Sequence, residues 1–293
     1  PTILDLPNGL APGVRAASDF LMALQLTGAA RRDSIANLQV RLPAVVIGGG
    51  LTAIDTATEA MAYYPVQVEK FLARYEALVA ERGEQAVRAR WLPVEAEIAD
   101  EFIAHARAIR AERKRAEAAN EAPDIRRLID GWGGVTLAYR RRLIDSPSYT
   151  LNHEEVQKAL EEGIRFAEEL RPEEIEVDAA GHAKAVRFCK GQDIPVTLPA
   201  RAVLVAAGTR PNTVLAREDA IHYEIDGKYF RLVDENNARV EPEWIAKPNE
   251  VRVFHSVRED GRAVSFFGDL HPSFAGNVVK AMASAKQGWP VVQ

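Results

Sequence analysis

The stretch Ala44-Val45-Val46-Ile47-Gly48-Gly49-Gly50-Leu51-Thr52-Ala53-Ile54-Asp55 decides the fold class of this chain. Its four leading apolar residues predict a buried strand, and the pattern from Ala53 to Tyr63 predicts a helix that ends near Pro65. The turn between them reads Gly48-x-Gly50-x-x-Ala53, which fits a dinucleotide-binding fingerprint. There the first glycine permits a tight turn, the second admits a phosphate, and a small third residue lets the helix pack on the strand. The helix N-terminus would face the anion.

Composition narrows the classes of function. The chain has 293 residues, a net charge of -5 and a pI near 5.8. The chain therefore lacks the excess of positive charge that would indicate a nucleic acid as its main partner. No run of 18 apolar residues and no signal-peptide pattern occurs in the sequence, so we expect no membrane span and a cytoplasmic location.

Cysteine and histidine usage limits the chemistry. Cys189 is the single cysteine, which excludes an internal disulfide, a redox dithiol and a cysteine-ligated iron-sulfur cluster within this chain. The six histidines show no metal-ligand spacing, so we predict no metal site. No nucleophile or acid-base pair stands out either, and we assign no catalytic side chain.

The charged block 65–130 carries two helical stripes. Each has four apolar residues at helical spacing, in the sets Val68, Leu72, Tyr75, Val79 and Ile98, Phe102, Ala106, Ile109. The stripes predict an antiparallel helical hairpin, inserted in the first crossover, and a short helix follows at 124–130. Such an insertion should be removable, because loop-closure entropy grows slowly with loop length.

A second strand is expected at Val135–Tyr139, directly before Arg140-Arg141-Arg142. In a nucleotide-binding unit the end of the second strand lies beside the adenosine ribose. An arginine there can hold a 2′-phosphate with its planar fork, so Arg140 and Arg141 predict a preference for NADP over NAD. Three solvated arginines after an edge strand remain the alternative.

The rest of the chain adds a helix at 153–169, a hairpin of 175–177 with 183–188, and a buried strand at 202–206. Beyond it, irregular sequence leads to a strand at 264–267, the pair Gly268-Asp269, and a helix from about Gly276 to Gln287.

Taken in order, these motifs resemble the FAD-dependent pyridine nucleotide-disulfide oxidoreductases, and among them the small subunit of bacterial glutamate synthase. The related region of dihydropyrimidine dehydrogenase is similar too. The resemblance rests on segments that match in sequence and order: 12–21, 46–55, 135–141, 161–166, 203–212, 268–269 and 275–281. The block 65–130 has no counterpart in it.

The resemblance implies an α/β fold: a Rossmann-like NADPH-binding domain over 43–212 with the helical insertion, and the C-terminal part of an FAD-binding domain over 213–293. Residues 1–42 would be a lead-in from an FAD-binding half, because no upstream glycine fingerprint precedes Pro43. The implied NADPH contacts are Gly48, Gly49, Gly50, Thr52, Ala53, Asp55, Arg140 and Arg141. Further implied cofactor contacts follow the strand that returns from the NADPH domain to the FAD domain: Ala207, Gly208 and Thr209. The implied FAD contacts are Gly268, Asp269, Asn277 and Val278.

The implied activity is hydride transfer from NADPH to FAD. The implied partners are the missing N-terminal FAD-binding half and an iron-sulfur electron-transfer module. Two alternatives remain open. One is a flavin reductase of the monooxygenase or ferredoxin-reductase kind. The other is a non-catalytic interaction module that works through 65–130 on a vestigial nucleotide fold.

Overall fold

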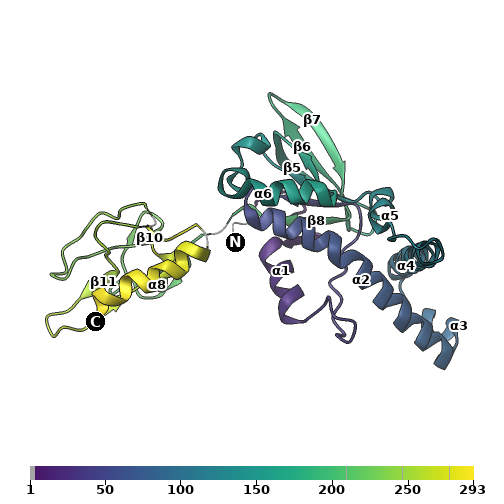
Figure 1. Ribbon diagram of the computed structural model, residues 1–293, viewed down its shortest axis with the longest axis horizontal. Helices are drawn as coiled ribbons and strands as arrows, with labels where there is room; N and C mark the ends of the chain where they lie inside the picture. The colour runs from purple at the N-terminus through teal and green to yellow at the C-terminus, as the bar shows by residue number, and fades with distance from the viewer. Residues whose placement is uncertain (1–3, 209, 246, 277) are drawn as a thin grey trace. The chain divides into compact units, whose positions relative to one another are not determined.

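The computed structural model describes residues 4–208, 210–245, 247–276 and 278–293. The chain divides into two compact units, residues 1–208 and 209–293 (Figure 1). The division falls close to the boundary predicted at residue 212. The predicted lead-in contributes a strand and a helix to the first unit.

A five-stranded parallel sheet is the centre of the first unit. Its strands are β1 (Val14–Ala16), β8 (Ala202–Val205), β2 (Ala44–Ile47), β3 (Val135–Ala138) and β4 (Arg165–Ala167), in that spatial order. Every pairing is parallel. The central strands are nearly continuous apolar runs because both faces of the sheet are covered. The predicted α/β fold class is confirmed.

Alternate residues of the central strands serve two cores. Val46 and Leu204 face a layer of helices, α1 (Ala17–Leu26), α2 (Leu51–Arg82) and α6 (Pro147–Glu162). Val45 and Val203 face an antiparallel sheet of β5 (Leu170–Val177), β6 (Ala183–Lys190) and β7 (Ile194–Pro199).

Two sequence predictions are wrong here, and a third, the hairpin of 175–177 with 183–188, is confirmed but incomplete. Helix α6 ends at Glu162 and not at 169, because Gly163 takes a left-handed C-cap and the chain enters β4. The predicted two-stranded hairpin has a third strand, β7. The crossover helix does not end near Pro65 but continues as α2 to Arg82.

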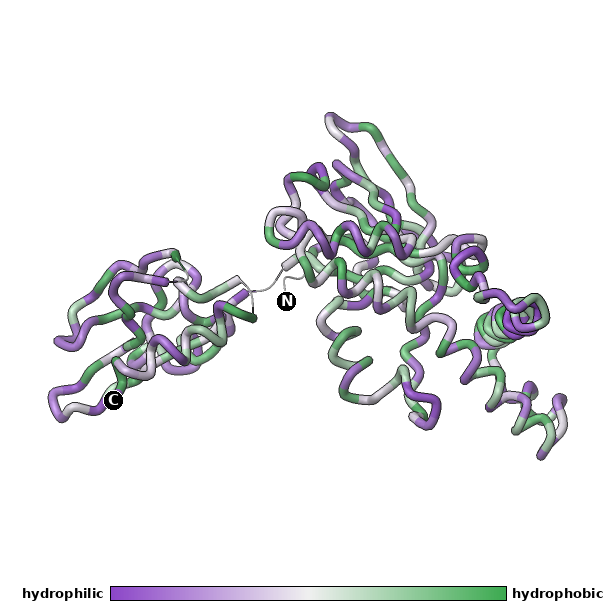
Figure 2. The backbone as a smooth tube through the Cα atoms, in the orientation of Figure 1, coloured by the Kyte–Doolittle hydropathy of each residue, from purple (hydrophilic) through white to green (hydrophobic). Residues whose placement is uncertain are grey.

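The predicted insertion is an extension of α2 followed by α3 (Glu84–Arg88), α4 (Pro93–Ala119) and α5 (Ile125–Gly131). A proline inside a helix costs about 3 kcal/mol. The continuation beyond Pro65 offsets this cost by burying residues of the predicted stripe, including Leu72, which is fully buried. Figure 2 shows hydrophobic residues recurring along α2 to its far end.

The insertion and the nucleotide fold share one hydrophobic core. Leu72 and Phe102 belong to the same buried cluster as Val46 and Leu204 of the sheet. Polar contacts add to this: the buried Gln67 side chain accepts a hydrogen bond from the Val40 amide at 3.0 Å. The packing therefore argues against the prediction that 66–130 can be replaced by a short linker.

The second unit is smaller. It contains α7 (Val214–Glu218), the pairs β9 (Ile225–Asp226) with β10 (Tyr229–Phe230) and β11 (Phe254–Val257) with β12 (Ala263–Ser265), the 3-10 turn η2 (Gly268–Leu270), and α8 (Val278–Val292). Aromatic side chains Phe230 and Phe266 surround the buried His255. Among the described residues of the whole chain, no helix is both long and apolar enough to span a membrane.

Candidate functional site

The candidate site of the first unit lies where the parallel strands end. From β2 the chain passes through α2 to β3 on one side, whereas β8 returns on the other side of β2. Ligands of open α/β sheets bind at such a switch point, outside the carboxyl ends of the strands. The turn Gly48–Gly50 follows β2 at this point.

The three glycines of the turn serve different purposes. A Cβ atom on Gly48 would lie 2.4 Å from the Ala206 carbonyl oxygen after β8, and one on Gly49 would lie 2.3 Å from the Tyr139 ring after β3. Packing therefore requires both glycines. A Cβ on Gly50 would meet nothing within 4 Å, and its φ of -95° suits any residue. Gly50 therefore faces open space.

Helix α2 begins at this open space without a side-chain cap. Gly50 is its N-cap residue, and no side chain there accepts a hydrogen bond from the first turn. Uncapped backbone amides and the helix dipole favour an anion. Thr52 is exposed on the first turn, and Ala53 is fully buried, as the fingerprint requires of its third position.

Asp55 lies one turn further along α2 and is exposed. Desolvation raises the pKa of its carboxyl group, and the nearby charges of Glu155 and Glu59 raise it further. Glu155 comes from α6, so α6 brings a carboxylate to α2 that the sequence analysis missed.

A second helix N-terminus also reaches the glycine turn. The Ser148 amide donates a hydrogen bond to the Gly49 carbonyl at 3.0 Å. Ser146 is the N-cap of α6 and accepts from the Tyr149 amide at 3.1 Å. Both serines are buried and contact each other, with their Oγ atoms 3.0 Å apart. The sequence analysis missed them, although a serine before a proline is a helix-start signal that could have found them.

A basic hollow of about 480 Å³ lies after β3. Four arginines contribute to its lining: Arg140, Arg141, Arg142 and Arg171. Arg142 is held by Asp145 at 2.8 Å and lowers the pKa of that carboxyl group. Arg140 and Arg141 are exposed and form no ion pair with any described residue. Arg171 reaches the hollow from β5, a strand far along the sequence, and was not predicted.

The remaining predicted residues follow β8 or lie in the second unit. Ala207 is half-buried, and the exposed Gly208 has a φ of +99°. Thr209 and Asn277 lie outside the described residues. The Gly268 amide donates to Ser284 Oγ at 2.8 Å, and the exposed Asp269 accepts from the Gly276 amide at 3.3 Å.

Val278, the last of the predicted residues, is the first residue of α8, with 69% of its surface exposed. Wherever the chain is described, no three His, Cys, Asp or Glu side chains are grouped to hold a metal ion. The single cysteine, Cys189, is buried, with Sγ 3.7 Å from Asp193 Oδ1.

Known proteins resemble this chain in sequence and in fold. It is 35% identical over 292 residues to the uncharacterized protein RP006 of Rickettsia prowazekii (strain Madrid E), and this match covers the whole chain but 36% of that relative. Among solved structures, thioredoxin reductase of Lactococcus lactis matches with a TM-score of 0.49 and 14% identity, covering 100% of this chain and 63% of that one. A ferredoxin reductase of Rhodopseudomonas palustris matches with a TM-score of 0.43 and 14% identity, and the match covers 97% of this chain and 49% of that one.

The family of this chain follows from a match to a protein-family model. The model for pyridine nucleotide-disulphide oxidoreductases matches residues 10–243, which include the glycine turn, the insertion and the basic hollow. That range is most of the chain. The chain therefore belongs to the pyridine nucleotide-disulphide oxidoreductase family.

Proposed function

We propose that the first unit binds NADPH, and that the second unit supplies part of an FAD site in an oxidoreductase of the glutamate synthase small-subunit type. When bound, NADPH supplies a hydride and FAD accepts it. The side chains of this family member would then bind and orient the cofactors, with no nucleophile or acid-base pair of their own.

One observation carries the nucleotide proposal: the uncapped start of α2 opens at Gly50 onto free space beside the carboxyl ends of β8, β2 and β3. A pyrophosphate there would accept hydrogen bonds from backbone amides and would meet the positive end of a 32-residue helix. Gly48 and Gly49 keep the turn tight by packing against both neighbouring strand ends.

The preference for NADPH over NADH rests on the basic hollow. Arg140 and Arg141 follow the strand adjacent to β2 and are free of ion pairs with the described residues. A guanidinium without a carboxylate partner is available to a phosphate and can bind it through two hydrogen bonds. Arg171, which lies 3.8 Å from Glu173, also lines the hollow, and the four arginines there outnumber the carboxylates of Asp145 and Glu169.

The FAD proposal rests on the second unit. Asp269 follows a glycine at the turn η2, and α8 begins a few residues later. The outer face of α8 is apolar and exposed, with Val278, Met282 and Trp289 each more than 60% exposed. Such a face favours burial against more protein. We infer that an N-terminal FAD-binding half covers it. The chain spans 36% of the length of its curated relative.

Electrons would leave through another module. One buried cysteine cannot form a dithiol, so the chain itself offers no disulfide relay. We propose an iron-sulfur module or subunit as the acceptor.

The nucleotide proposal is tested by calorimetry of the chain with NADPH and with NADH. NADPH should bind more tightly, and Arg140→Glu together with Arg141→Glu should remove the preference. Loss of a hydrogen bond to a charged group costs about 1.5 to 3 kcal/mol, or roughly tenfold or more in affinity. Arg90→Glu, an exposed arginine near the tip of the insertion, is the charge control. Equal affinities in the unchanged chain would refute the proposal.

The FAD proposal has its own test. The purified chain should be colourless, because the second unit holds only part of the proposed site. Joined to the proposed N-terminal FAD-binding half, it should bind FAD, and Asp269→Ala should weaken that binding. Stoichiometric yellow flavin in the isolated chain would contradict the division of the FAD site.

A further inference from the structure

A second cavity, of about 360 Å³, lies at the opposite edge of the parallel sheet, where β1 and β8 begin. Its walls come from segments far apart in sequence: residues 10–15, Phe20, 38–41, His182, Arg201, Ala202 and Leu204. Because the glycine turn follows the carboxyl ends of the strands, this cavity is separate from the proposed nucleotide site.

The charged side chains that line this cavity are all basic. Arg15, Arg41 and Arg201 contribute guanidinium groups, and His182 contributes its ring, whereas no carboxylate belongs to the lining. Asp178, on the turn that carries His182, accepts hydrogen bonds from the backbone amides of Ala180 and His182 at 2.9 Å each. This anchoring fixes the turn.

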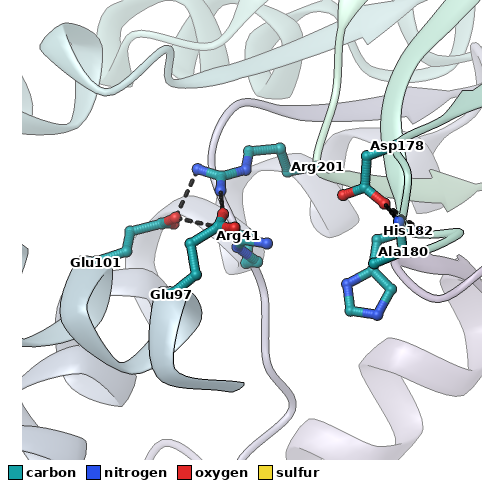
Figure 3. A network of polar contacts seen from close by, with 7 residues as sticks. All are labelled: Arg41, Glu97, Glu101, Asp178, Ala180, His182 and Arg201. Carbon is teal, nitrogen blue, oxygen red and sulfur yellow. Dashed lines mark hydrogen bonds and ion pairs between the residues drawn. The ribbon is translucent and has the colours of Figure 1, made fainter. Parts of the chain in front are cut away.

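Two glutamates of α4, which do not line the cavity, form ion pairs with two of these arginines. Arg41 Nη2 lies 3.1 Å from Glu97 Oε1 and 2.6 Å from Glu101 Oε2, and Arg201 contacts the same two carboxylates at 2.9 and 2.5 Å. Figure 3 shows both arginines converging on the glutamates, with His182 on the far side of Arg41. The glutamates thus orient the guanidinium groups, while Glu97, 65% exposed, is screened by solvent.

Not every hydrogen-bond donor among these arginines has an acceptor in the described part of the chain. The Arg41 side chain is only 7% exposed, yet its Nε has no hydrogen-bond partner. Buried donors without a partner are costly and uncommon in folded proteins. Arg15 is half-buried and forms no ion pair with the described part of the chain. Glu101 Oε1, on the far side of the ion pair, is also buried without a partner. An acceptor in the cavity would serve Arg15 and Arg41 Nε, whereas Glu101 does not line the cavity.

We propose that this cavity binds a small organic anion whose carboxylate or phosphate group lies among Arg15, Arg41 and Arg201. The planar guanidinium groups suit either anion. The apolar side chains of Phe20, Leu38 and Leu204 would contact the carbon part of the ligand. The site is independent of the proposed nucleotide function, and its arginines connect it to the insertion through Glu97 and Glu101.

The test titrates the full 293-residue chain with succinate and with inorganic phosphate, using calorimetry at low salt. Succinamide, which is neutral and of similar size, is the matched ligand control. Arg15→Gln removes one guanidinium without breaking an ion pair, and His182→Gln is a second variant for the case that the first misfolds. The double variant Arg140→Glu, Arg141→Glu alters only the distant basic hollow.

Saturable binding of succinate or phosphate is expected, together with no binding of succinamide. Arg15→Gln should weaken this binding roughly tenfold or more, since a hydrogen bond to a charged group is lost. The double variant should bind succinate as the unchanged chain does, and with phosphate it should lose only the binding that belongs to the basic hollow. Absence of saturable succinate binding, an unaffected Arg15→Gln variant, or succinate binding lost only in the double variant would each overturn the proposal. Succinate and phosphate together distinguish a carboxylate site from a phosphate site.

Discussion

Leu72→Ala tests whether the insertion and the nucleotide fold form one cooperative unit. Leu72 lies on α2 beyond Pro65, is fully buried, and belongs to the cluster that includes Val46 of the sheet. Truncating a buried leucine to alanine costs about 2 to 5 kcal/mol, through lost burial and the cavity left behind. We expect about 3 kcal/mol, because Leu72 is fully buried where α2 packs against α4, and the surrounding side chains can collapse only partly.

Two probes report on the two regions during urea unfolding. In a Trp244→Phe, Trp289→Phe background, tryptophan fluorescence comes from Trp91 and Trp132, next to α4. Labelling of Cys189, the only cysteine and buried on β6, reports on the antiparallel sheet against the opposite face of the parallel sheet. Both unfolding midpoints should fall together.

Leu78→Ala is the matched control, because Leu78 lies on the same helix and is 40% exposed. It should change the free energy of unfolding by about 0.5 kcal/mol or less. If Leu72→Ala shifts the fluorescence transition and leaves the Cys189 labelling rate unchanged, the insertion is separable after all. The shared-core argument would then be refuted, and the linker replacement predicted from sequence would be restored.

Two further predictions concern the glycine turn and a buried histidine. Gly50→Val should leave the fold intact and weaken NADPH binding at least tenfold, whereas Gly49→Ala should destabilise the fold because its methyl group would press on Tyr139. Circular dichroism melts measure the stability of both variants, and NADPH titration measures their affinity. An unchanged NADPH affinity in Gly50→Val would contradict the proposed phosphate position. His105 stacks on Trp132 and has its pKa lowered to about 4 by burial, so the unfolded chain takes up this proton near pH 6.5 before the folded chain does. The free energy of unfolding should therefore fall by about 2 kcal/mol as pH falls from about 6.5 to 4, after allowing for the partial exposure of His105. Urea unfolding at a series of pH values measures this loss, and it should be absent in His105→Gln. The same pH dependence in His105→Gln would contradict the assignment to His105.

Local signals decided much of the fold before any tertiary contact was known. The strand at 44–47, the glycine turn after it and the strand at 135–138 were readable because apolar runs and turn glycines act on neighbouring residues. The two stripes around Leu72 and Phe102 were readable for the same reason, since helical spacing places buried residues on one face. The strand at 202–205 was found in the same way.

Tertiary packing decided the rest, because the residues concerned meet across long stretches of sequence. Helix α2 passes through Pro65 since burial in the shared core outweighs a local penalty that sequence rules treat as a stop. Arg171 joins the basic hollow from β5, and Ser148 reaches Gly49 from α6. The cluster of Arg41 and Arg201 with the α4 glutamates has no local pattern at all, because its members are brought together only when β2, β8 and α4 pack.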